Sequence, residues 1–484
     1  MATPVDEGLK VESVSHVEVQ DVEPQTDIEQ KGESSIDPRV LRKLGRKVDF
    51  RIIPILSLVY SLSIIDRINI GHAKVVGMEK DLSMLGNPSA YSICLLVFFP
   101  AYMLAELPGN MALVKFGVAK TLAFLMFGFG ISTLAQGHTQ SWPVLAFCRV
   151  LVGIFEASTF PAAVVLISAW YVRYQAHQKL ALMYSVGLIA SSFAGVLAYG
   201  LGKMEGIGGL RGWRWIFTME GLVTVLCAVP TLLFTVDFPD RARFLTEQER
   251  TLRMQQLKAD KGDVETEQIS WKNLKDLKDW RMWLVTFMYF CNVCMVYGMG
   301  FFVPSILVGL GYSGLDATLH SAPPYLVACG FLWITSFLAD HIHRRLPIII
   351  VQASIGITGL ALMSQIQLGP QARYAGMCLA VAACQSNNSA IIIFGQNNTV
   401  GSAKTNLAAV LNIAGGTIGG IVGSTVYMGK EAPSYTTGLS ITMALQACLL
   451  LSCAAVWLVN ARGNRQADRG EVVLNGVQGW RWTL

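Results

Sequence analysis

Residues 282–315 read MWLVTFMYFCNVCMVYGMGFFVPSILVGLGYSGL and contain no Asp, Glu, Lys or Arg. An uncharged stretch of this length can cross a bilayer, which takes a helix of roughly 20 apolar residues. The whole chain of 484 residues is 52% hydrophobic and only 15% charged, whereas soluble domains are about 25% charged. Other long runs without these four residue types are 82–105, 121–148, 180–202, 346–372, 374–403, 405–429 and 432–461. The sequence therefore predicts a polytopic membrane protein and argues against a soluble multidomain enzyme.

Hydrophobic runs and their breaks predict twelve spans. Unpaired backbone groups are costly in hydrocarbon, and the alternation of a barrel is absent, so these spans are expected to be helices. A charged stretch after the sixth span divides them into two sets of six, as in a transporter built from two parallel repeats. The predicted spans are 52–71, 91–112, 121–137, 144–169, 180–202, 215–236, 283–306, 319–339, 346–366, 374–395, 406–428 and 436–459.

These spans predict an all-α integral membrane fold with two six-helix bundles related by a pseudo-twofold axis. The acidic segment 1–37 has almost no large apolar residue and is expected to be disordered. Small residues spaced four apart in the eleventh span, from Gly415 to Gly423, predict close helix packing. The expected parts are a disordered tail 1–45, an N-terminal bundle 46–236, a linker 237–281, a C-terminal bundle 282–461 and a tail 462–484.

The distribution of positive charge predicts the orientation. A basic segment, 39–51, lies directly before the first span, and most of the 38 Lys and Arg residues fall in tails and loops on that same side. Such residues concentrate on the cytoplasmic side, so both termini are expected to be cytoplasmic. Orientation also explains the net charge of +5, and no nucleic-acid partner is predicted.

The ten cysteines lie within apolar runs, so a disulfide scaffold is not expected. Cys291 and Cys294 match the C-x-x-C pattern, but no further Cys or His lies near them in a membrane helix. We interpret them as buried thiols, with a metal or redox role as the less favoured alternative. No metal site and no cofactor are predicted.

Charged side chains inside the spans are the most informative residues. A charge at the centre of a bilayer costs about 2.5–3.5 kcal/mol even on the lenient insertion scale, so it requires a partner, a water-filled cavity or a function. Glu106 and Glu220 lie nearer the ends of their spans and are weaker candidates. The candidates well inside spans are Asp66, Arg67, Arg149 and Glu156.

The spacing of these four residues suggests roles without deciding between alternatives. Arg149 and Glu156 are seven residues apart, so they share a helix face about 10 Å apart and need not pair with each other. One can hold an anion or a carboxylate of another helix while the other takes up a proton. Adjacent Asp66 and Arg67 point about 100° apart, and a carboxylate balanced in this way can change its protonation state. An interhelical ion-pair network, or a gating salt bridge for Asp66, remains the alternative.

Arginine suits a carboxylate ligand because its planar fork donates two parallel hydrogen bonds. Arg67 and Arg149 therefore predict an anionic substrate. Polar residues within apolar helices are further candidates for the binding site, although each alone is more often a helix-packing hydrogen bond. They are Tyr60, Asn69, Tyr184, Gln385, Asn387, Asn388 and Asn412.

Two short loops occupy corresponding places in the two halves. One follows the second span and contains Lys115 and Lys120; the other follows the eighth span. Both are predicted to fix helix ends by charge pairing and by contact with helix dipoles. The predicted gating or structural charges are Lys115, Asp340, Arg344 and Arg345.

Several motifs together resemble one family. Residues 66–73, DRINIGHA, are similar to the D-R-x-N-x-G-x-A signature in the first helix of the anion:cation symporter family of the major facilitator superfamily. The fourth span, from Arg149 through Glu156 to Tyr171, resembles that family as well, as do residues 212–221 and 237–246. Within the family, the sequence is most similar to the fungal allantoate permease subfamily, whose members take up allantoate, nicotinate, pantothenate, biotin and related organic acids.

The resemblance implies a twelve-helix proton symporter of the plasma membrane that works by alternating access. It implies that Asp66 and Glu156 are protonation sites, that Arg67 binds the substrate carboxylate, and that Arg149 links to the protonation sites. The sequence departs from the family at His72, where Asn is commoner. In addition, the loop 113–120 lacks the Asp of the general superfamily motif.

We therefore expect a proton-coupled importer of a small carboxylate-bearing metabolite or vitamin. Its expected partners are an anionic small molecule, protons and the lipid bilayer, and it is expected to act as a monomer. One alternative is an exporter of a secondary metabolite or toxin, because the fold does not fix the direction of transport. Another is a nutrient sensor that binds substrate without moving it. An enzyme is not expected, because no nucleophile, metal or cofactor constellation is visible.

Overall fold

The structure is a computed structural model that describes residues 38–242, 244–261, 277–342, 344–399, 402–427, 429–432, 434–472, 474 and 480–483. All regular secondary structure in this part of the chain is helical. The predicted tail as far as residue 37 and part of the predicted linker, 262–276, lie outside the described residues. The first described residues, 38–47, form a unit separate from the rest of the chain, and the arrangement below concerns residues 48 onward.

Twelve helices of the described residues are long and apolar enough to cross a membrane. This confirms the predicted all-α fold with twelve spans. The first span runs through α1 (Pro38–Ala73), the π-helix η2 (Lys74–Met78) and α2 (Glu79–Asp81). The remaining α-helices are α3 (Ala90–Leu96), α4 (Phe98–Phe116), α5 (Val118–Gln136), α6 (Trp142–Glu156), α7 (Thr159–Trp170), α8 (Arg173–Gly202), α9 (Gly212–Phe234), α10 (Glu247–Lys261), α11 (Trp280–Gly309), α12 (Gly314–His320), α13 (Ala322–Ile342), α14 (Leu346–Ser364), α15 (Pro370–Asn397), α16 (Ser402–Val426) and α17 (Thr436–Asp468).

The helices differ from the predicted parts of the chain in three places. Helix α1 begins at Pro38, within the predicted tail 1–45, and proline is favoured at the first position of a helix. Helix α17 continues to Asp468, past residue 461, and the predicted linker contains α10. Hydropathy marks where a chain leaves the apolar layer, whereas charged residues can continue a helix into water. The predicted boundaries therefore followed hydropathy rather than the helix ends.

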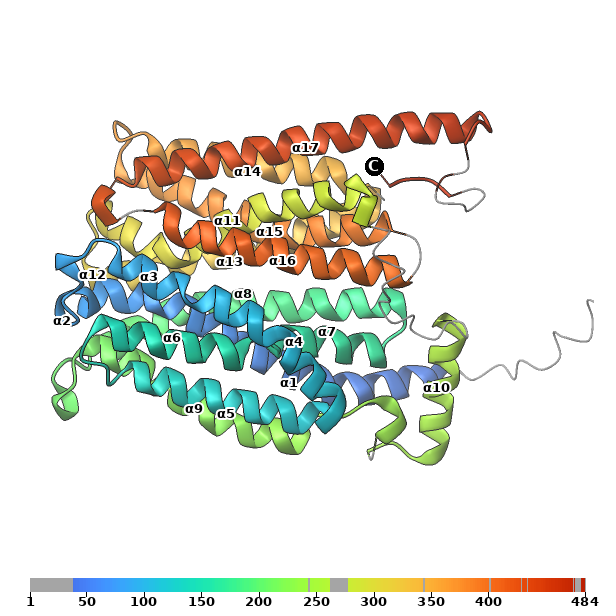
Figure 1. Ribbon diagram of the computed structural model, residues 1–484, viewed down its shortest axis with the longest axis horizontal. Coiled ribbons are helices and arrows are strands. Elements are labelled where there is room, and N and C mark those ends of the chain that lie inside the picture. Colours follow the sequence, from blue (N-terminus) through green and yellow to red (C-terminus); the bar gives the residue numbers. More distant parts are fainter. Residues whose placement is uncertain are drawn as a thin grey trace, which may run out of the picture. The chain divides into compact units, whose positions relative to one another are not determined.

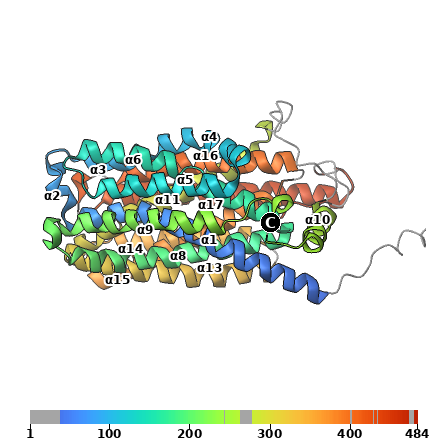
Figure 2. The same cartoon turned by 90° about the horizontal axis from the view of Figure 1, so that it is seen from below.

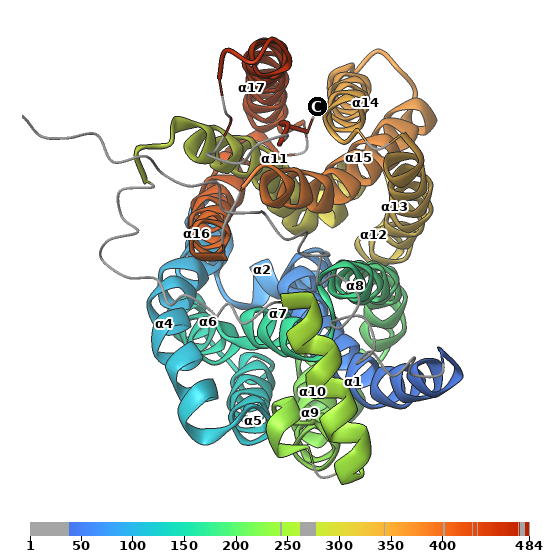
Figure 3. The same ribbon diagram turned by 90° about the vertical axis from the view of Figure 1, so that its right-hand side faces the viewer.

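The membrane helices pack in two groups, which Figure 3 shows along the helix axes. We call α1–α9 the first group and α11–α17 the second group. In the first group, α5 packs against α9 and α6; in the second, α14 packs against α15 and α11 packs against α16. One end of the bundle, the α10 end, carries α10 and the start of α11. The opposite α12 end carries α2 and α12 (Figures 1 and 2).

Glycines allow the closest of these helix contacts. A Cβ at Gly359 of α14 would lie 2.6 Å from the Gly376 carbonyl oxygen of α15. A Cβ at Gly419 of α16 would lie 2.7 Å from the Phe290 oxygen of α11, and one at Gly423 would lie 2.5 Å from the Cys294 oxygen. Small residues let helix backbones approach in this way, which confirms the predicted packing role of the glycines in the eleventh span.

The two groups meet closely at the α12 end. The Tyr91 hydroxyl of α3 donates to the Phe301 carbonyl of α11 at 3.1 Å, and the Ser192 hydroxyl of α8 donates to the Ala322 carbonyl of α13 at 3.0 Å. A Cβ at Gly71 of α1 would lie 2.6 Å from the same Phe301 oxygen. The α12 end is therefore closed by direct contact between backbones.

We expect Gly314→Ala to loosen this closed end. The added methyl group would overlap the backbone carbonyl of Val75, and overpacking of this kind costs about 1–3 kcal/mol. That energy changes the ratio of two conformations by roughly 5- to 150-fold. Spin labels are attached through keto amino acids at the exposed positions Leu85 and Lys430. The variant should show a population in which the two labels are farther apart than in the wild type.

Gly330→Ala is the matched control for this substitution, because nothing lies within 4 Å of its added Cβ. It should leave the distance distribution of the wild type unchanged. An unchanged distribution in Gly314→Ala would mean that the closed end tolerates the methyl group.

Candidate functional site

A buried ion pair joins α1 to α6 near the middle of the first group. Arg149 Nη1 lies 2.7 Å from Asp66 Oδ2, and the side chains of Arg149 and Asp66 are 3% and 0% exposed. Arg149 Nη2 also donates to the Asp66 carbonyl oxygen at 3.4 Å, and the Thr133 hydroxyl of α5 donates to Asp66 Oδ1 at 2.9 Å. Both carboxylate oxygens are therefore satisfied, as a buried charge requires.

A second ion pair joins the same two helices at the next residue of α1. Arg67 Nε lies 2.6 Å from Glu156 Oε1, and the Ser63 hydroxyl donates to the same oxygen. Glu156 is fully buried, and its second oxygen, Oε2, has no partner among the described residues. Arg149 and Glu156 thus share a face of α6 without pairing, and each binds a partner on α1.

Arg67 also reaches the second group of helices. Its Nη1 donates to the Tyr297 hydroxyl of α11 at 2.7 Å. Its guanidinium carbon lies 5.5 Å from the ring centre of Phe98 and 5.3 Å from that of Tyr102, so aromatic faces add a cation–π attraction. The Arg67 side chain is 18% exposed, which makes it the accessible member of the two ion pairs.

A third buried carboxylate lies on α9. Glu220 is 7% exposed, and its Oε2 accepts a hydrogen bond from Asn69 Nδ2 at 2.7 Å. Its position near the end of a span suggested a weaker candidate. The structure instead buries it between helices of the first group. His72, the departure from the family signature, is also buried on α1, and its Nδ1 has no partner among the described residues.

An aromatic and amide cluster lies between α1, α8 and α15. The Tyr60 ring lies 6.2 Å from the Tyr184 ring, measured between centres. The Tyr184 hydroxyl donates to Gln385 Oε1 at 2.8 Å, while Asn388 Nδ2 lies 3.5 Å from that hydroxyl. Asn387 is buried, and neither of its amide atoms has a partner in the described part of the chain. The structure therefore brings four of the predicted polar residues, Tyr60, Tyr184, Gln385 and Asn388, into one cluster that joins the two groups.

Comparisons with known proteins identify the family. Residues 56–424 match the Major Facilitator Superfamily. The chain belongs to this superfamily. It is 31% identical over 484 residues to the MFS transporter prlL of a fungal species (strain NRRL 50135), covering 98% of this chain and 97% of the relative. It is 30% identical over 467 residues to the MFS-type transporter efuF of Hormonema carpetanum, covering 92% and 93%.

Solved structures share the fold of this superfamily member. A bacterial homologue of the human lysosomal transporter Spinster, inward-facing and unoccupied, has a TM-score of 0.65 at 16% identity, covering 85% of this chain and 96% of the other. A D-xylose–proton symporter has a TM-score of 0.64 at 14% identity, covering 84% and 97%. At these identities the likeness shows the fold alone. The chain is a multi-pass membrane protein of a transporter superfamily and not an enzyme.

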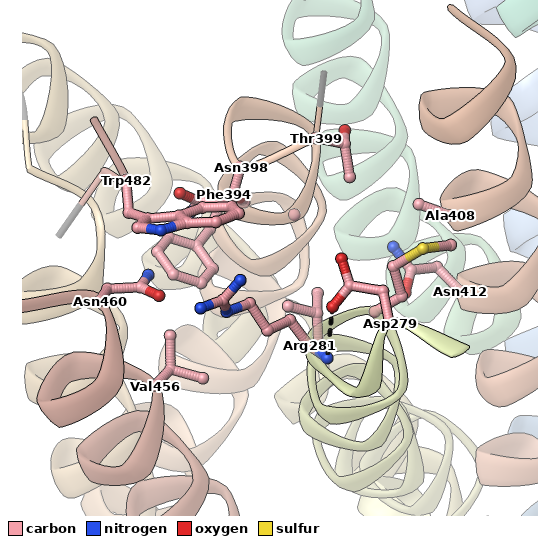
Figure 4. Close-up of a pocket in the computed structure, with 13 residues that line it drawn as sticks. Asp279, Arg281, Phe394, Asn398, Thr399, Ala408, Asn412, Val456, Asn460 and Trp482 are labelled. Carbon is pink, nitrogen blue, oxygen red and sulfur yellow. Dashed lines mark hydrogen bonds between the residues drawn. The ribbon is translucent and has the colours of Figure 1, made fainter. Parts of the chain in front are cut away.

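Asn412 of this transporter lies apart from the ion pairs. Its Oδ1 accepts a hydrogen bond from the Thr286 hydroxyl at 3.0 Å. It lines a small cavity of about 30 Å³ at the α10 end of the second group (Figure 4). Trp482 also lines this cavity, with its ring centre 4.2 Å from the Arg281 guanidinium carbon. The C-terminal segment is fixed there because Asn464 Nδ2 donates to the Trp482 carbonyl oxygen at 2.9 Å.

The four predicted loop charges differ in the contacts that they make. Arg345 Nη2 lies 3.0 Å from Asp340 Oδ1 near the end of α13. Arg344 is exposed, and the Lys115 ammonium nitrogen lies 5.4 Å from the ring centre of Phe116. Only Asp340 and Arg345 therefore form an ion pair among these four residues.

Asp237, which follows α9, places its carboxylate at the start of α5, beside the loop 113–120. Its Oδ1 accepts from the backbone N–H groups of Val118 at 2.9 Å and Ala119 at 3.3 Å. These are the first residues of α5, where unpaired N–H groups and the helix dipole favour a negative charge. The sequence showed Asp237 only as part of a family motif, because a cap supplied from 119 residues away leaves no local signal.

We expect Asp237→Ala to lower the free energy of unfolding by about 0.5–2 kcal/mol, as for the loss of other helix caps. Thermal unfolding in detergent, followed by tryptophan fluorescence, measures the change. Asp340→Ala is the control, because its carboxylate is 59% exposed and exposed ion pairs contribute about 0–1 kcal/mol. Equal stability of Asp237→Ala and the wild type would contradict the capping role.

Helix α10 is fastened to the same end of the first group. Arg253 is buried, and its Nε donates to the Trp170 carbonyl oxygen at 3.0 Å. Burial lowers the pKa of Arg253. The neighbouring Tyr171 hydroxyl donates to Asp49 Oδ1 at 2.8 Å, and its pKa is raised by burial and by that carboxylate. The described part of the predicted linker is thus attached to the end of α7.

Proposed function

We propose that this protein is a proton-coupled transporter of a small organic anion and that it belongs to the allantoate permease subfamily of the anion:cation symporters. The single observation that carries the proposal is the position of Arg67. This guanidinium binds a buried carboxylate on α6 and a tyrosine on α11, and it retains an exposed surface. The family resemblance of residues 66–73 supports the same role.

The geometry makes anion and proton binding mutually favourable. A substrate carboxylate that takes the place of Glu156 on Arg67 leaves Glu156 buried without a cation. A buried, unpaired carboxylate favours its neutral form, so Glu156 takes up a proton when the anion binds. Conversely, a protonated Glu156 binds Arg67 less strongly and frees the guanidinium for the anion. Asp66 and Arg149 hold α1 and α6 in place and supply a second carboxylate that can take up a proton.

The same contacts connect binding to alternating access. The Arg67–Tyr297 hydrogen bond crosses from the first group of helices to the second, so an anion at Arg67 acts on the relative position of the two bundles. The distribution of Lys and Arg supports placing the α10 end and both termini in the cytoplasm. The family resemblance supports the plasma membrane as the location. The backbone contacts at the α12 end then close the site toward the outside.

Transport into proteoliposomes tests the proposal. The purified protein is supplied in turn with radiolabelled nicotinate, pantothenate, biotin, allantoate and gluconate, with or without an inward proton gradient, at a clamped membrane potential. At least one compound should accumulate above its external concentration only when the gradient is present. Transport of none of them, or accumulation that ignores the gradient, would reject the proposal. Movement only toward the α12 side would indicate an exporter.

Glu156→Gln should abolish gradient-driven accumulation of that compound and retain exchange of labelled for unlabelled compound, because glutamine mimics the protonated acid. Glu106→Gln is the matched control, since this glutamate lies on α4 and its side chain makes no ion pair among the described residues. Undiminished accumulation in Glu156→Gln would show that the coupling residue is wrong.

A further inference from the structure

Glu220 is a buried acid that the cycle above does not use. Its Oε2 is bound by Asn69, and no cation lies within ion-pair distance of it in the part of the chain that the structure describes. Asn69 is three residues from Asp66 on α1, and residues at this spacing are neighbours on a helix face. Glu220 therefore lies about one helical turn from the Asp66–Arg149 pair, toward the α12 end.

The ion pairs near Glu220 leave one buried carboxyl group without a cation among the described residues. Arg149 is matched by Asp66, and Arg67 is matched by Glu156. Glu220 is the third carboxyl of the group and has no matching guanidinium. A buried charge without a partner is disfavoured relative to its neutral form, so the balance of the network favours a proton on Glu220.

Hydrogen bonding at Asn69 leads to the same conclusion. After the amide nitrogen of Asn69 has donated to Glu220 Oε2, the two remaining atoms of the pair are Asn69 Oδ1 and Glu220 Oε1. Both are buried and neither has a partner among the described residues. Both are also acceptors if Glu220 is ionised, so they cannot bind each other. A proton on Oε1 turns it into a donor for Asn69 Oδ1 and completes a reciprocal pair of carboxylic acid and amide.

Among the described residues, the surroundings of Glu220 offer no further unpaired charge that would stabilise its anion. The charges that act on it are Asp66 on α1 and Arg149 and Glu156 on α6, and these are already paired. Helix α5, which packs against α9, has no charged residue from 121 to 136, and α8 has none from 180 to 202. On η2, Lys74 is paired with Glu79 at 3.4 Å. His72 on α1 makes no ion pair in the described part of the chain.

We propose that Glu220 is a protonated carboxylic acid in the conformation closed at the α12 end and serves as a further proton-binding residue of the transport cycle. The inference rests on the proposed function for its role in transport, but not for the proton itself. When Glu220 loses the proton, a negative charge arises one turn from Asp66. That charge favours protonation of Asp66 and release of Arg149, so the proton can move between the two acids as the bundles rearrange.

Infrared spectroscopy of the purified protein in phosphatidylcholine vesicles tests the protonation state without any substrate. At neutral pH the wild type should show a carbonyl stretching band of a buried carboxylic acid. Glu220→Gln should lose this band, whereas Glu106→Gln should keep it. A band that is absent from the wild type or unchanged in Glu220→Gln would overturn the proposal. Glu220→Asp, which retains an acid, should keep a band and guards against a folding defect in the glutamine variant.

The role in transport is measured separately, with whichever compound the wild type accumulates. The static-head ratio at a fixed proton gradient gives the number of protons moved per substrate. Glu220→Gln should move one proton fewer per substrate, and Glu106→Gln should match the wild type. An unchanged ratio in Glu220→Gln would overturn the role of Glu220 in the cycle. Failure of gradient-driven uptake in the wild type would count against the proposed function instead, and the infrared result would still stand.

Discussion

Arg149→Ala is expected to lower the free energy of unfolding by about 3–5 kcal/mol, because it leaves Asp66 charged and buried without its cation. Asp66 is fully buried, and the substitution removes its bonds from both Nη1 and Nη2 of Arg149. Among the described residues, the neutral Thr133 hydroxyl is then the one remaining side-chain partner of that carboxylate. The loss is measured from thermal or denaturant unfolding of the purified protein in detergent.

The companion substitution Asp66→Asn separates the loss of a charge partner from the loss of packing. In the Arg149→Ala background it should restore much of the stability, since the asparagine carries no charge that needs a cation. Lys179→Ala is the control, because its partner Asp49 is 32% exposed and such pairs contribute about 0–1 kcal/mol. Equal stability of Arg149→Ala and Lys179→Ala would contradict the importance of burial at Asp66.

The twelve-helix fold could be predicted because it depends on where uncharged and charged residues lie along the chain. In a membrane, long uncharged runs that lack the alternation of a barrel form helices. The charged stretch 237–281 separates two sets of six such helices. Helix ends were less predictable. Asp279 shows why, since its carboxylate accepts from the Arg281 backbone N–H at the start of α11 and also pairs with Lys404 at 2.6 Å. That helix begins where a cap is available, and hydropathy alone does not record this.

The residues of the buried charged cluster were predictable from the sequence, but their pairing was not. Buried charges are costly, so a sequence that retains Asp66, Arg67, Arg149 and Glu156 inside spans already identifies them. Which acid meets which arginine depends on how α1 crosses α6, and residues 83 and 89 positions apart carry no local record of that. The interhelical ion-pair network that the sequence left open as an alternative is present. The hydrogen bond from Arg67 to Tyr297 of the second group could not be predicted from the sequence.

Glu220 and Asn412 show two ways in which position and polarity in the sequence fail to predict where a side chain lies. Glu220 lies only eight residues from the start of α9, yet its neighbours bury it beside Asn69. Asn412 is polar and within a span, yet it binds Thr286 and lines a cavity at the α10 end. Distance from the end of a span does not measure burial, and a polar side chain does not reveal the face on which it lies.

Arg67→Lys should reduce the kcat/KM of transport by about 100-fold or more, although it preserves the positive charge. Arg67 uses Nε for Glu156 and Nη1 for Tyr297 at the same time. A lysine ammonium is a single point on a flexible chain and cannot occupy both positions. In the proposed cycle the anion takes over the Nε contact from Glu156, while Nη1 keeps Tyr297. Hydrogen bonds to charged groups contribute about 1.5–3 kcal/mol each, so losing both contacts amounts to about 3 kcal/mol or more of transition-state stabilisation.

Tyr297→Phe is the graded comparison for this prediction. It removes one of the two partners and leaves the Glu156 pair intact, so its kcat/KM should fall by about 10-fold, as expected for a single hydrogen bond to a charged group. Initial rates of uptake are measured for the compound that the wild type accumulates, at equal amounts of protein in the vesicles. If Arg67→Lys transports as fast as the wild type, a point charge suffices at this position. The forked contact that joins the anion to the second bundle would then have no part in the cycle.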